Sequence, residues 1–391
     1  MHEERKMILK MIEDGKITAE EGLQLLNALK DEKGSVESPK GDGSRNQKSG
    51  PHGDPDPFDD TDSNAGKKST DHYVSRNVNW EGGGYRRAEE KMTTFATKFS
   101  EFVEDAVHKI KEFDLDFNFG SSVEIQHIFH HRNASVKEVD IHVENGSITF
   151  RPWDEDDVRV ECNVKVYKVR DTDEARRVFL DDVMFNYADE KVKLDSRKKS
   201  MKVNTTVYVP KKSLEKIKLY AFNGKISGEN VTLNKLETQT VNGRISFEAL
   251  QADEVRLETV NGTVSVTRLE AGQSDIKTVN GTISVNTAEG DLDAETLNGT
   301  VHYTLLEPAN ARAYIKTTTG SVNVRVPDGV KTEGELKSTV GGISCDLPQM
   351  TVIDEKKEFA SKKMSFLSNK NEAAHFYVEA EATTGAISVK N

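Results

Sequence analysis

The clearest pattern along the chain is a short motif in which apolar and polar positions alternate on both sides of an Asn-Gly pair. A typical copy is Thr259-Val-Asn-Gly-Thr-Val-Ser265, and its alternation predicts two short β-strands that meet at a tight turn. The glycines of the five clear copies follow one another at intervals of 19, 19, 19 and 18 residues. These glycines are Gly224, Gly243, Gly262, Gly281 and Gly299.

A repeat of this length predicts a β-solenoid, because each short coil buries its apolar side only by stacking on its neighbours. Weaker copies at Gly320, Gly341 and Gly385 continue the array at intervals of 21, 21 and 44 residues. The last interval predicts one coil without a readable motif, and Asn145-Gly146 is interpreted as an earlier, isolated copy. We expect a mainly β fold: a parallel β-solenoid (β-helix-like) of about 19–21 residues per coil over residues 221–391.

Two other β architectures fit the repeat less well. A propeller needs about 40–45 residues per blade, and an antiparallel meander of Asn-Gly hairpins does not require whole copies to stay in phase. Stacked coils would place the asparagine amides above one another as a hydrogen-bonded ladder, while glycine would supply positive φ. We interpret as structural the ladder of Asn223, Gly224, Asn242, Gly243, Asn261, Gly262, Asn280, Gly281, Asn298 and Gly299. The Thr and Ser columns beside it are the better surface for an extended ligand: Thr263, Ser265, Thr282, Ser284 and Thr300.

The N-terminal region is predicted to hold a small helical unit and a linker. Residues 1–30 form a helical hairpin whose second helix begins at a capping box, Thr18-Ala-Glu-Glu21. A hairpin of this size is too small to be stable alone, so its apolar faces are expected to meet a partner or a second copy. Residues 31–86 are rich in Gly, Pro, Ser, Asp and Asn and are predicted to be disordered. The hairpin residues with a predicted interaction role are Ile12, Ile17, Leu23 and Leu26.

Residues 87–119 contain an amphipathic helix with phenylalanines at helical spacing on one face. The helix either enters a membrane interface or a partner groove, or it caps the end of the following β domain. Membrane-surface helices usually have basic polar faces, whereas residues 91–120 have a charge balance of −2, which favours the cap. Contact with lipid stays open. The candidate interaction residues are Phe95, Phe99 and Phe102.

Residues 120–220 alternate with period two and predict a further β-rich domain, with a short helix that begins near Thr172. Segment 161–220 has a charge balance of +5, although the whole chain has a net charge of −12. Segment 221–305 has a balance of −6, and an acidic rod repels phosphate backbones. We therefore do not expect nucleic-acid binding.

Composition and motifs exclude most catalytic classes. Only 35% of the 391 residues are hydrophobic, which fits a linker plus narrow coils filled by Ile, Val, Thr and Asn. Walker A, Rossmann, HExxH and nucleophile-elbow motifs are absent from the sequence. Cys162 and Cys345 cannot form a disulfide framework, and His127, His130 and His131 are interpreted as surface or packed side chains. No catalytic residue, metal or cofactor is expected.

The sequence also bears on location. No apolar run approaches the ~18–20 residues of a transmembrane helix. The first residues, Met1-His-Glu-Glu-Arg-Lys6, do not begin an apolar signal peptide. We expect a cytoplasmic protein, with peripheral contact at the membrane left open.

Two parts of the chain together resemble a bacterial family. Ile12-Glu-Asp-Gly-Lys-Ile-Thr-Ala-Glu-Glu-Gly-Leu-Gln-Leu-Leu26 resembles the short N-terminal domain of YvlB/LiaX-type proteins. The Thr-Val-Asn-Gly-x-Ile-Ser repeats resemble the associated β-strand-repeat domain, which is labelled as an adhesin and has no established function. The resemblance implies a Gram-positive protein linked to cell-envelope stress, with membrane stress-response partners of the phage-shock type. It implies no catalytic residues.

From these observations we predict a non-enzymatic scaffold that acts through protein partners or self-association in the cell-envelope stress response. The alternative is an envelope-facing, adhesin-like binder that holds a glycan or an antimicrobial peptide along the solenoid face. An enzyme of the β-helix polysaccharide lyase or hydrolase kind comes third, because such enzymes use clustered charged residues on longer coils.

Overall fold

The chain divides into two compact units, Met1–Glu89 and Glu90–Asn391. The computed structural model describes only residues of the second unit, so the predicted hairpin and linker lie outside the described residues. The described residues are 99–110, 120–212, 214–358 and 361–391.

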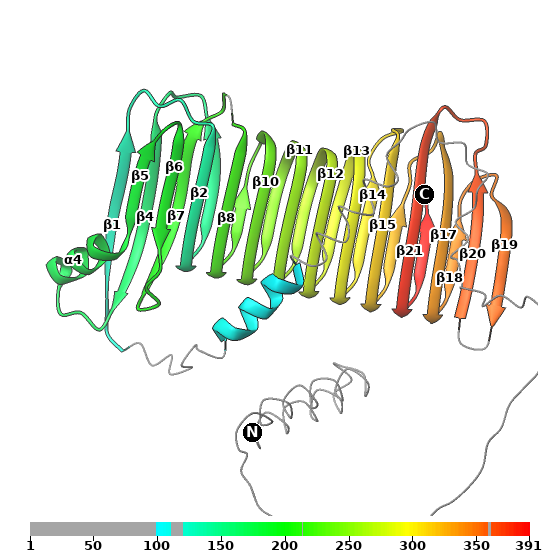
Figure 1. Ribbon diagram of the computed structural model, residues 1–391. Helices are drawn as coiled ribbons and strands as arrows, with labels where there is room; N and C mark the ends of the chain where they lie inside the picture. Colours follow the sequence, from blue (N-terminus) through cyan, green and yellow to red (C-terminus); the bar gives the residue numbers. More distant parts are fainter. Residues whose placement is uncertain (1–98, 111–119, 213, 359–360) are drawn as a thin grey trace, which may run out of the picture. The chain divides into compact units, whose positions relative to one another are not determined.

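The second unit contains a parallel β-solenoid, as the repeat predicts (Figure 1). Each coil contributes one strand before its glycine turn and one after it, and both pair in parallel with the same strands of the next coil. From Ile245↔Val264 to Asn261↔Asn280, the paired residues are 19 positions apart in the sequence. One sequence repeat is therefore one coil, and we call the stack of coils the rod.

The strands form two ranks along the rod. The leading rank contains the strands that precede the turns. In stack order it begins with β6 (Lys191–Ser196), β2 (Glu138–Asn145), β8 (Lys216–Asn223) and β10 (Val231–Asn242). It continues with the second halves of β11 (Ile245–Asn261), β12 (Val264–Asn280) and β13 (Ile283–Asn298), and ends with β15 (Ala311–Thr319), β21 (Ala374–Thr384) and β17 (Val330–Val340). The trailing rank, after the turns, consists of β7 (Met201–Pro210), β3 (Ile148–Trp153), β9 (Ile226–Gly228), the first halves of β11, β12 and β13, then β14 (Val301–Leu305), β16 (Val322–Arg325), β22 (Ile387–Lys390) and β18 (Ile343–Asp346).

The last repeat in the sequence is not the last coil of the stack. β21 pairs in parallel with β15 on one side and with β17 on the other, so the coil of Gly385 lies between those of Gly320 and Gly341. The 44-residue interval contains a hairpin of β19 (Thr351–Glu358) and β20 (Ser361–Ser368), and β20 pairs antiparallel with β17. The prediction of an additional coil without a motif is therefore wrong.

The copy of the motif at Asn145 also belongs to the stack. β2 pairs in parallel with β8, and Asn145 lies beside Asn223, although 78 residues separate the two in sequence. The residues between them return as β6 and β7, which form one more coil on the other side of β2 and β3. The asparagine column therefore begins at Asn145, and the interpretation of this copy as isolated is wrong.

Antiparallel strands close both ends of the rod. At one end β4 (Val158–Tyr167) pairs with β7, β1 (Ser122–His131) pairs with β4, and β5 (Met184–Ala188) pairs with β6. The helix predicted near Thr172 is α4 (Thr172–Asp182), which packs against this end with Phe179 fully buried. The hairpin of β19 and β20 closes the other end of the leading rank. Such caps hinder the addition of further strands to a solenoid.

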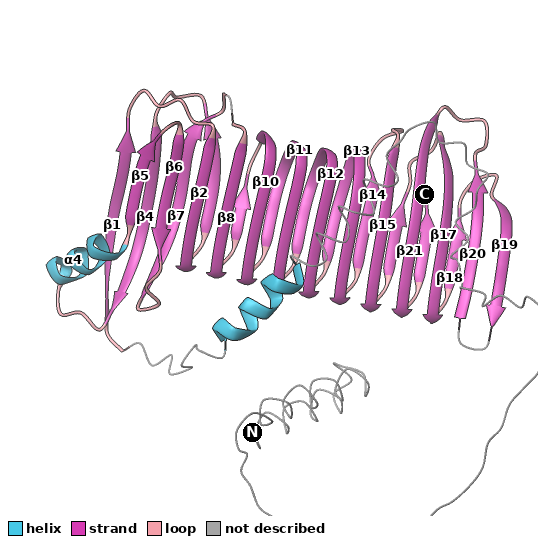
Figure 2. Cartoon of the chain, viewed as in Figure 1, coloured by secondary structure: helices cyan, strands magenta, loops and turns pink. Residues whose placement is uncertain are grey.

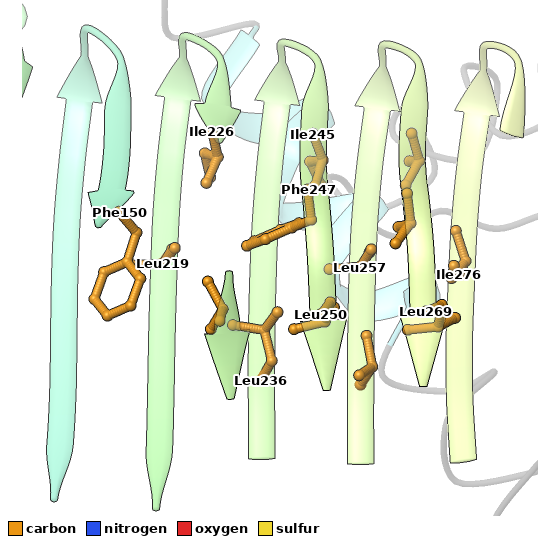
Figure 3. Packing of buried hydrophobic residues seen from close by; sticks show 14 of the residues in the cluster. Phe150, Leu219, Ile226, Leu236, Ile245, Phe247, Leu250, Leu257, Leu269 and Ile276 are labelled. Atoms are coloured by element: carbon orange, nitrogen blue, oxygen red, sulfur yellow. The ribbon is translucent and has the colours of Figure 1, made fainter. Parts of the chain in front are cut away.

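The interior is one thin, continuous layer of apolar side chains between the two ranks (Figure 3). Tyr303 and Phe376, from coils distant in sequence, stack with ring centroids 5.4 Å apart. The threonine of the motif also points inward, and the buried hydroxyl of Thr259 donates to the carbonyl oxygen of Gly243 at 3.1 Å. Asn261 is exposed, so the expectation that asparagine helps to fill the coils is wrong.

Candidate functional site

A row of apolar residues runs along the outside of the leading rank. It occupies the strand position just after the last inward residue and just before the turn, where most copies have asparagine, so its side chain points away from the core. Glu144 holds this position in the first coil with the motif, and Thr318 and Thr383 hold it further along the rod. We call the apolar part the outer stripe: Phe222, Val241, Val260, Val279 and Leu297.

The 99–110 helix lies beside the strands of the rod (Figure 2), and its apolar residues pack on the outer stripe. Phe102 and Ala106, which are 9% and 1% exposed, pack with Phe222, Val241 and Val260 in an apolar cluster that is separate from the core. The apolar face of this helix is therefore buried against the rod.

The length of the helix matches the part of the stripe that it covers. Twelve helical residues span about 18 Å, and the four coil spacings from Glu144 to Val279 span about 19 Å. At one end of the helix, the ring centroid of Phe99 lies 5.9 Å from the Nζ of Lys277. Leu297 lies one coil further along the stripe and is 38% exposed.

Polar contacts fix the other end of the helix. The Nζ of Lys109 lies 3.2 Å from Glu144 Oε1 and donates to the Tyr220 hydroxyl at 3.0 Å. His142 bonds the same Glu144 oxygen at 3.2 Å. Burial by itself would raise the pKa of Glu144, but hydrogen bonds from His142 and Lys109 outweigh it and hold the pKa below its ordinary value. The charged Glu144 thus ends the apolar contact and anchors the last turn.

The structure places the predicted helix residues as follows. Phe102 and Phe99 face the rod, whereas Phe95 and the four hairpin residues lie outside the described residues. The expectation that the helix caps the end of the β domain is wrong, because the apolar area that it covers lies on the flank of the rod. The solvent side of the helix is acidic, which is not typical of membrane-surface helices. Its exposed acids are Glu101, Glu104 and Asp105.

Three carboxylates from successive coils lie on the same outward face, one of them buried and the other two half-buried. They belong to Glu258, Asp275 and Asp293, and burial raises the pKa of each of them. The pKa of Asp293 reaches about 6, because the nearby Asp275 and Glu295 act in the same direction as burial. Lys277, whose side chain is 4% exposed, opposes this effect and bonds Glu295 at 2.9 Å.

Replacing Asp293 with asparagine is expected to stabilise the protein at neutral pH. The pKa of Asp293 is raised above its ordinary 3.8, so the stability that its protonated form contributes is present below about pH 4 and is lost as the pH rises through about 6. A shift from 3.8 to about 6 corresponds to at most about 3 kcal/mol. Urea unfolding of the natural protein and of the Asp293→Asn variant, at about pH 5 and about pH 7.5, measures the difference in their free energies of unfolding.

The matched control for this experiment is Glu248→Gln, which neutralises an exposed carboxylate on the same rod. We expect it to leave the difference in stability between the two pH values unchanged. If Asp293→Asn also leaves that difference unchanged, the carboxylate of Asp293 does not titrate as the structure indicates.

The turn asparagines form a hydrogen-bonded ladder on the outside of the rod. The Nδ2 of Asn242 donates to the Oδ1 of Asn223 at 2.8 Å, and the next bonds, from Asn261, Asn280 and Asn298, are 3.0, 2.9 and 3.0 Å long. All four bonds point in the same direction, so the ladder is polarised. Its acceptor end is at Asn298 and its donor end is at Asn223.

Glycine is required at these turns chiefly for space. A Cβ on Gly262 would overlap the carbonyl oxygen of Gly243, and every other motif glycine faces the backbone of an adjacent coil in the same way. Positive φ occurs at Gly146, Gly320 and Gly385, with values of 134°, 146° and 147°. The expected role of positive φ thus holds for three motif glycines and is wrong for the others.

The histidines and cysteines singled out in the sequence are either packed in the fold or paired at its surface. The His127 ring lies 4.4 Å from the Phe129 ring, and His130 bonds Asp157 at 2.9 Å. Burial raises the pKa of Cys162 to about 12, so its thiol stays protonated at neutral pH. Within the described ranges, no three His, Cys, Asp or Glu side chains gather closely enough to hold a metal ion. No helix in this part of the chain has both the length and the apolar character of a membrane span.

Sequence reasoning missed the outer stripe as a site, although the motif contained a signal. Val279 shares a strand face with charged Lys277, and a solvated face would carry polar residues at such positions. The contacts of Lys109 could not be predicted from its neighbours in the sequence, because its partners Glu144 and Tyr220 are 35 and 111 residues away. The Thr and Ser columns predicted as a ligand surface are half-buried.

Comparison with known proteins shows that two families match separate parts of the chain. The Toastrack DUF4097 family matches residues 136–390, and the SHOCT-like domain matches residues 3–34. The uncharacterized protein YvlB of Bacillus subtilis (strain 168) is 38% identical over 396 residues, which cover 100% of this chain and 99% of that protein. The resemblance to YvlB-type proteins is thereby confirmed.

Solved structures of candidate adhesins are also similar. One from Bacteroides fragilis NCTC 9343 is 12% identical, covers 68% of this chain and 97% of its own, and has a TM-score of 0.39. Another from Parabacteroides distasonis ATCC 8503 is 12% identical, covers 69% and 97%, and has a TM-score of 0.37. The matching family is not a known enzyme family. Because the family match takes in more than half of the chain, and the YvlB match its whole length, this chain belongs to the Toastrack DUF4097 family.

Proposed function

We propose that this chain is a non-enzymatic interaction scaffold in the bacterial cell-envelope stress response. The observation that carries the proposal is the 99–110 helix on the outer stripe, where the flank of the rod serves as a receptor for an amphipathic helix. A stiff row of in-register coils offers such a surface without any catalytic group. The exposed Leu297 extends the surface beyond the resident helix.

Within this proposal, residues 1–30 dock the partner, and the rod is the scaffold part of the same chain. The match of residues 3–34 to the SHOCT-like domain supports a separate N-terminal module. The partners are proteins of the membrane stress response, of the phage-shock type, or a second copy of the chain. The protein acts in the cytoplasm, at the periphery of the membrane.

Proximity labelling in envelope-stressed cells tests this function. Fused to the full chain, the labelling enzyme is expected to mark membrane stress-response proteins. A chain that lacks residues 1–30 should lose these partners while its circular dichroism spectrum keeps the β signal of the rod. If the shortened chain marks the same partners, residues 1–30 are not the docking element.

A second variant separates the role of the outer stripe from that of the hairpin. Val241→Asp places a carboxylate beneath Phe102, where burial is costly, so the 99–110 helix should lose its protection from hydrogen exchange. Thr383→Asp makes the same change at the equivalent, exposed position of another coil and serves as the control. If the protection of the helix is equal in both variants, the stripe does not hold the helix.

A further inference from the structure

A polar hollow of about 470 Å³ lies at the donor end of the asparagine ladder. It is formed where β7, β2 and β8 meet, in the first coils of the motif. None of its lining residues is acidic, although the chain has a net charge of −12. The lining residues with polar side chains include Asn145, Ser147, Lys202, Asn204, Asn223 and Lys225.

Two amides in the lining have their oxygens occupied and their nitrogens available. The Oδ1 of Asn204 accepts from the backbone N of Ser147 at 3.2 Å and from its hydroxyl at 3.0 Å. The Oδ1 of Asn223 accepts from Asn242 at 2.8 Å. Among the described residues, neither Nδ2 has a hydrogen-bond acceptor, so both remain as donors. The polarised ladder behind Asn223 strengthens its donor character.

The two lysines give the hollow a positive charge that the rod does not neutralise. Lys202 and Lys225 are exposed, and within the described part of the chain no carboxylate lies within 4.0 Å of either ammonium group. Other lysines of the rod are paired, for example Lys235 with Glu254 at 2.8 Å. A group that enters this hollow therefore meets donors and positive charge.

We propose that this hollow binds a single phosphate group. Phosphate oxygens only accept hydrogen bonds when ionised, and lysine is a common phosphate ligand, so the donors and charges fit. The hollow accommodates one such group with part of its ester. A long polyanion would continue onto the acidic coils of segment 221–305 and be repelled, which restricts the ligand to an isolated phosphate.

Calorimetric titration of the full-length protein with inorganic phosphate and with glycerol 3-phosphate tests the site. We expect dissociation constants of about 0.1–1 mM, as two exposed lysines and two amides would give. The double variant Lys202→Gln, Lys225→Gln should bind about 10-fold more weakly or not at all. Asn223→Asp should weaken binding as much, because it keeps an acceptor for Asn242 but replaces a donor with a negative charge.

Lys390→Gln is the matched control, since it removes an exposed lysine near the other end of the rod. It should bind like the natural protein. Flotation with phosphatidylglycerol vesicles distinguishes the kind of molecule that carries the phosphate. If the natural protein floats with the vesicles and the double variant does not, the ligand is a lipid headgroup. If phosphate binds in the calorimeter but the protein does not float, the ligand is a soluble phosphoester. Both results support the site. The proposal is overturned if neither probe binds, or if binding survives in the double variant.

Discussion

Replacing Gly262 with alanine is expected to destabilise the rod by about 3–5 kcal/mol, an effect typical of severe core substitutions. The new Cβ would overlap the carbonyl oxygen of Gly243 and lie 3.1 Å from the hydroxyl of Thr259. Neither group can move freely, because Thr259 already donates to Gly243 and the backbone N of Gly262 donates to Asn280 O at 3.0 Å. The coils must therefore separate locally. The midpoint and slope of urea unfolding measure the loss.

Gly342→Ala is the control for this substitution. Gly342 also lies in a turn of the stack, but a Cβ there meets no atom within 4 Å. We expect a change of less than about 1 kcal/mol, or a slight stabilisation from the stiffer unfolded chain. Equal unfolding midpoints for the two variants would show that close stacking does not select glycine at these turns.

Deleting residues 374–391 is expected to unfold more of the chain than the residues removed. These residues form β21 and β22, which lie between the coils of Gly320 and Gly341. Without them, residues 330–368 lose their parallel neighbour and should become sensitive to protease, while the coils up to Gly320 stay protected. Limited proteolysis followed by mass spectrometry of the fragments measures this pattern.

Point substitutions probe the same coil in the intact chain. Phe376 is fully buried and stacks on Tyr303, so Phe376→Ala should cost about 3–5 kcal/mol. Ile353 is 65% exposed in the end hairpin, so Ile353→Ala should change stability by less than about 0.5 kcal/mol. Continued protection of residues 330–368 in the truncated chain would contradict the observed order of the coils.

The periodic features of the fold could be predicted from the sequence because they repeat. Each coil uses the same local chemistry, so the spacing of Gly243, Gly262 and Gly281 predicts both the coil length and the parallel register. The order of the coils in space depends instead on pairing between strands that are distant in the sequence. The edges of all coils present similar backbone groups, so nothing in the motif at Gly385 indicates that it pairs with Gly320 and Gly341.

The candidate site could be predicted only in part, for a related reason. The apolar face of the 99–110 helix and the valines of the outer stripe are both visible as patterns. Their pairing depends on Glu144, which the parallel pairing of β2 with β8 places next to Phe222. The hollow likewise combines Lys202 with Lys225 through strands whose neighbours in space are distant in sequence. Patterns within one segment do not contain that information.

The position of β21 has a consequence for how the chain folds as it is synthesised. A solenoid with coils in sequence order can fold one coil at a time as the chain leaves the ribosome, which synthesises about 5–20 residues per second. Here residues 330–368 emerge before the coil on which they stack, so they wait without a parallel neighbour until residues 374–391 follow. We expect this region to be the last to become protected during synthesis and the one that most needs a chaperone.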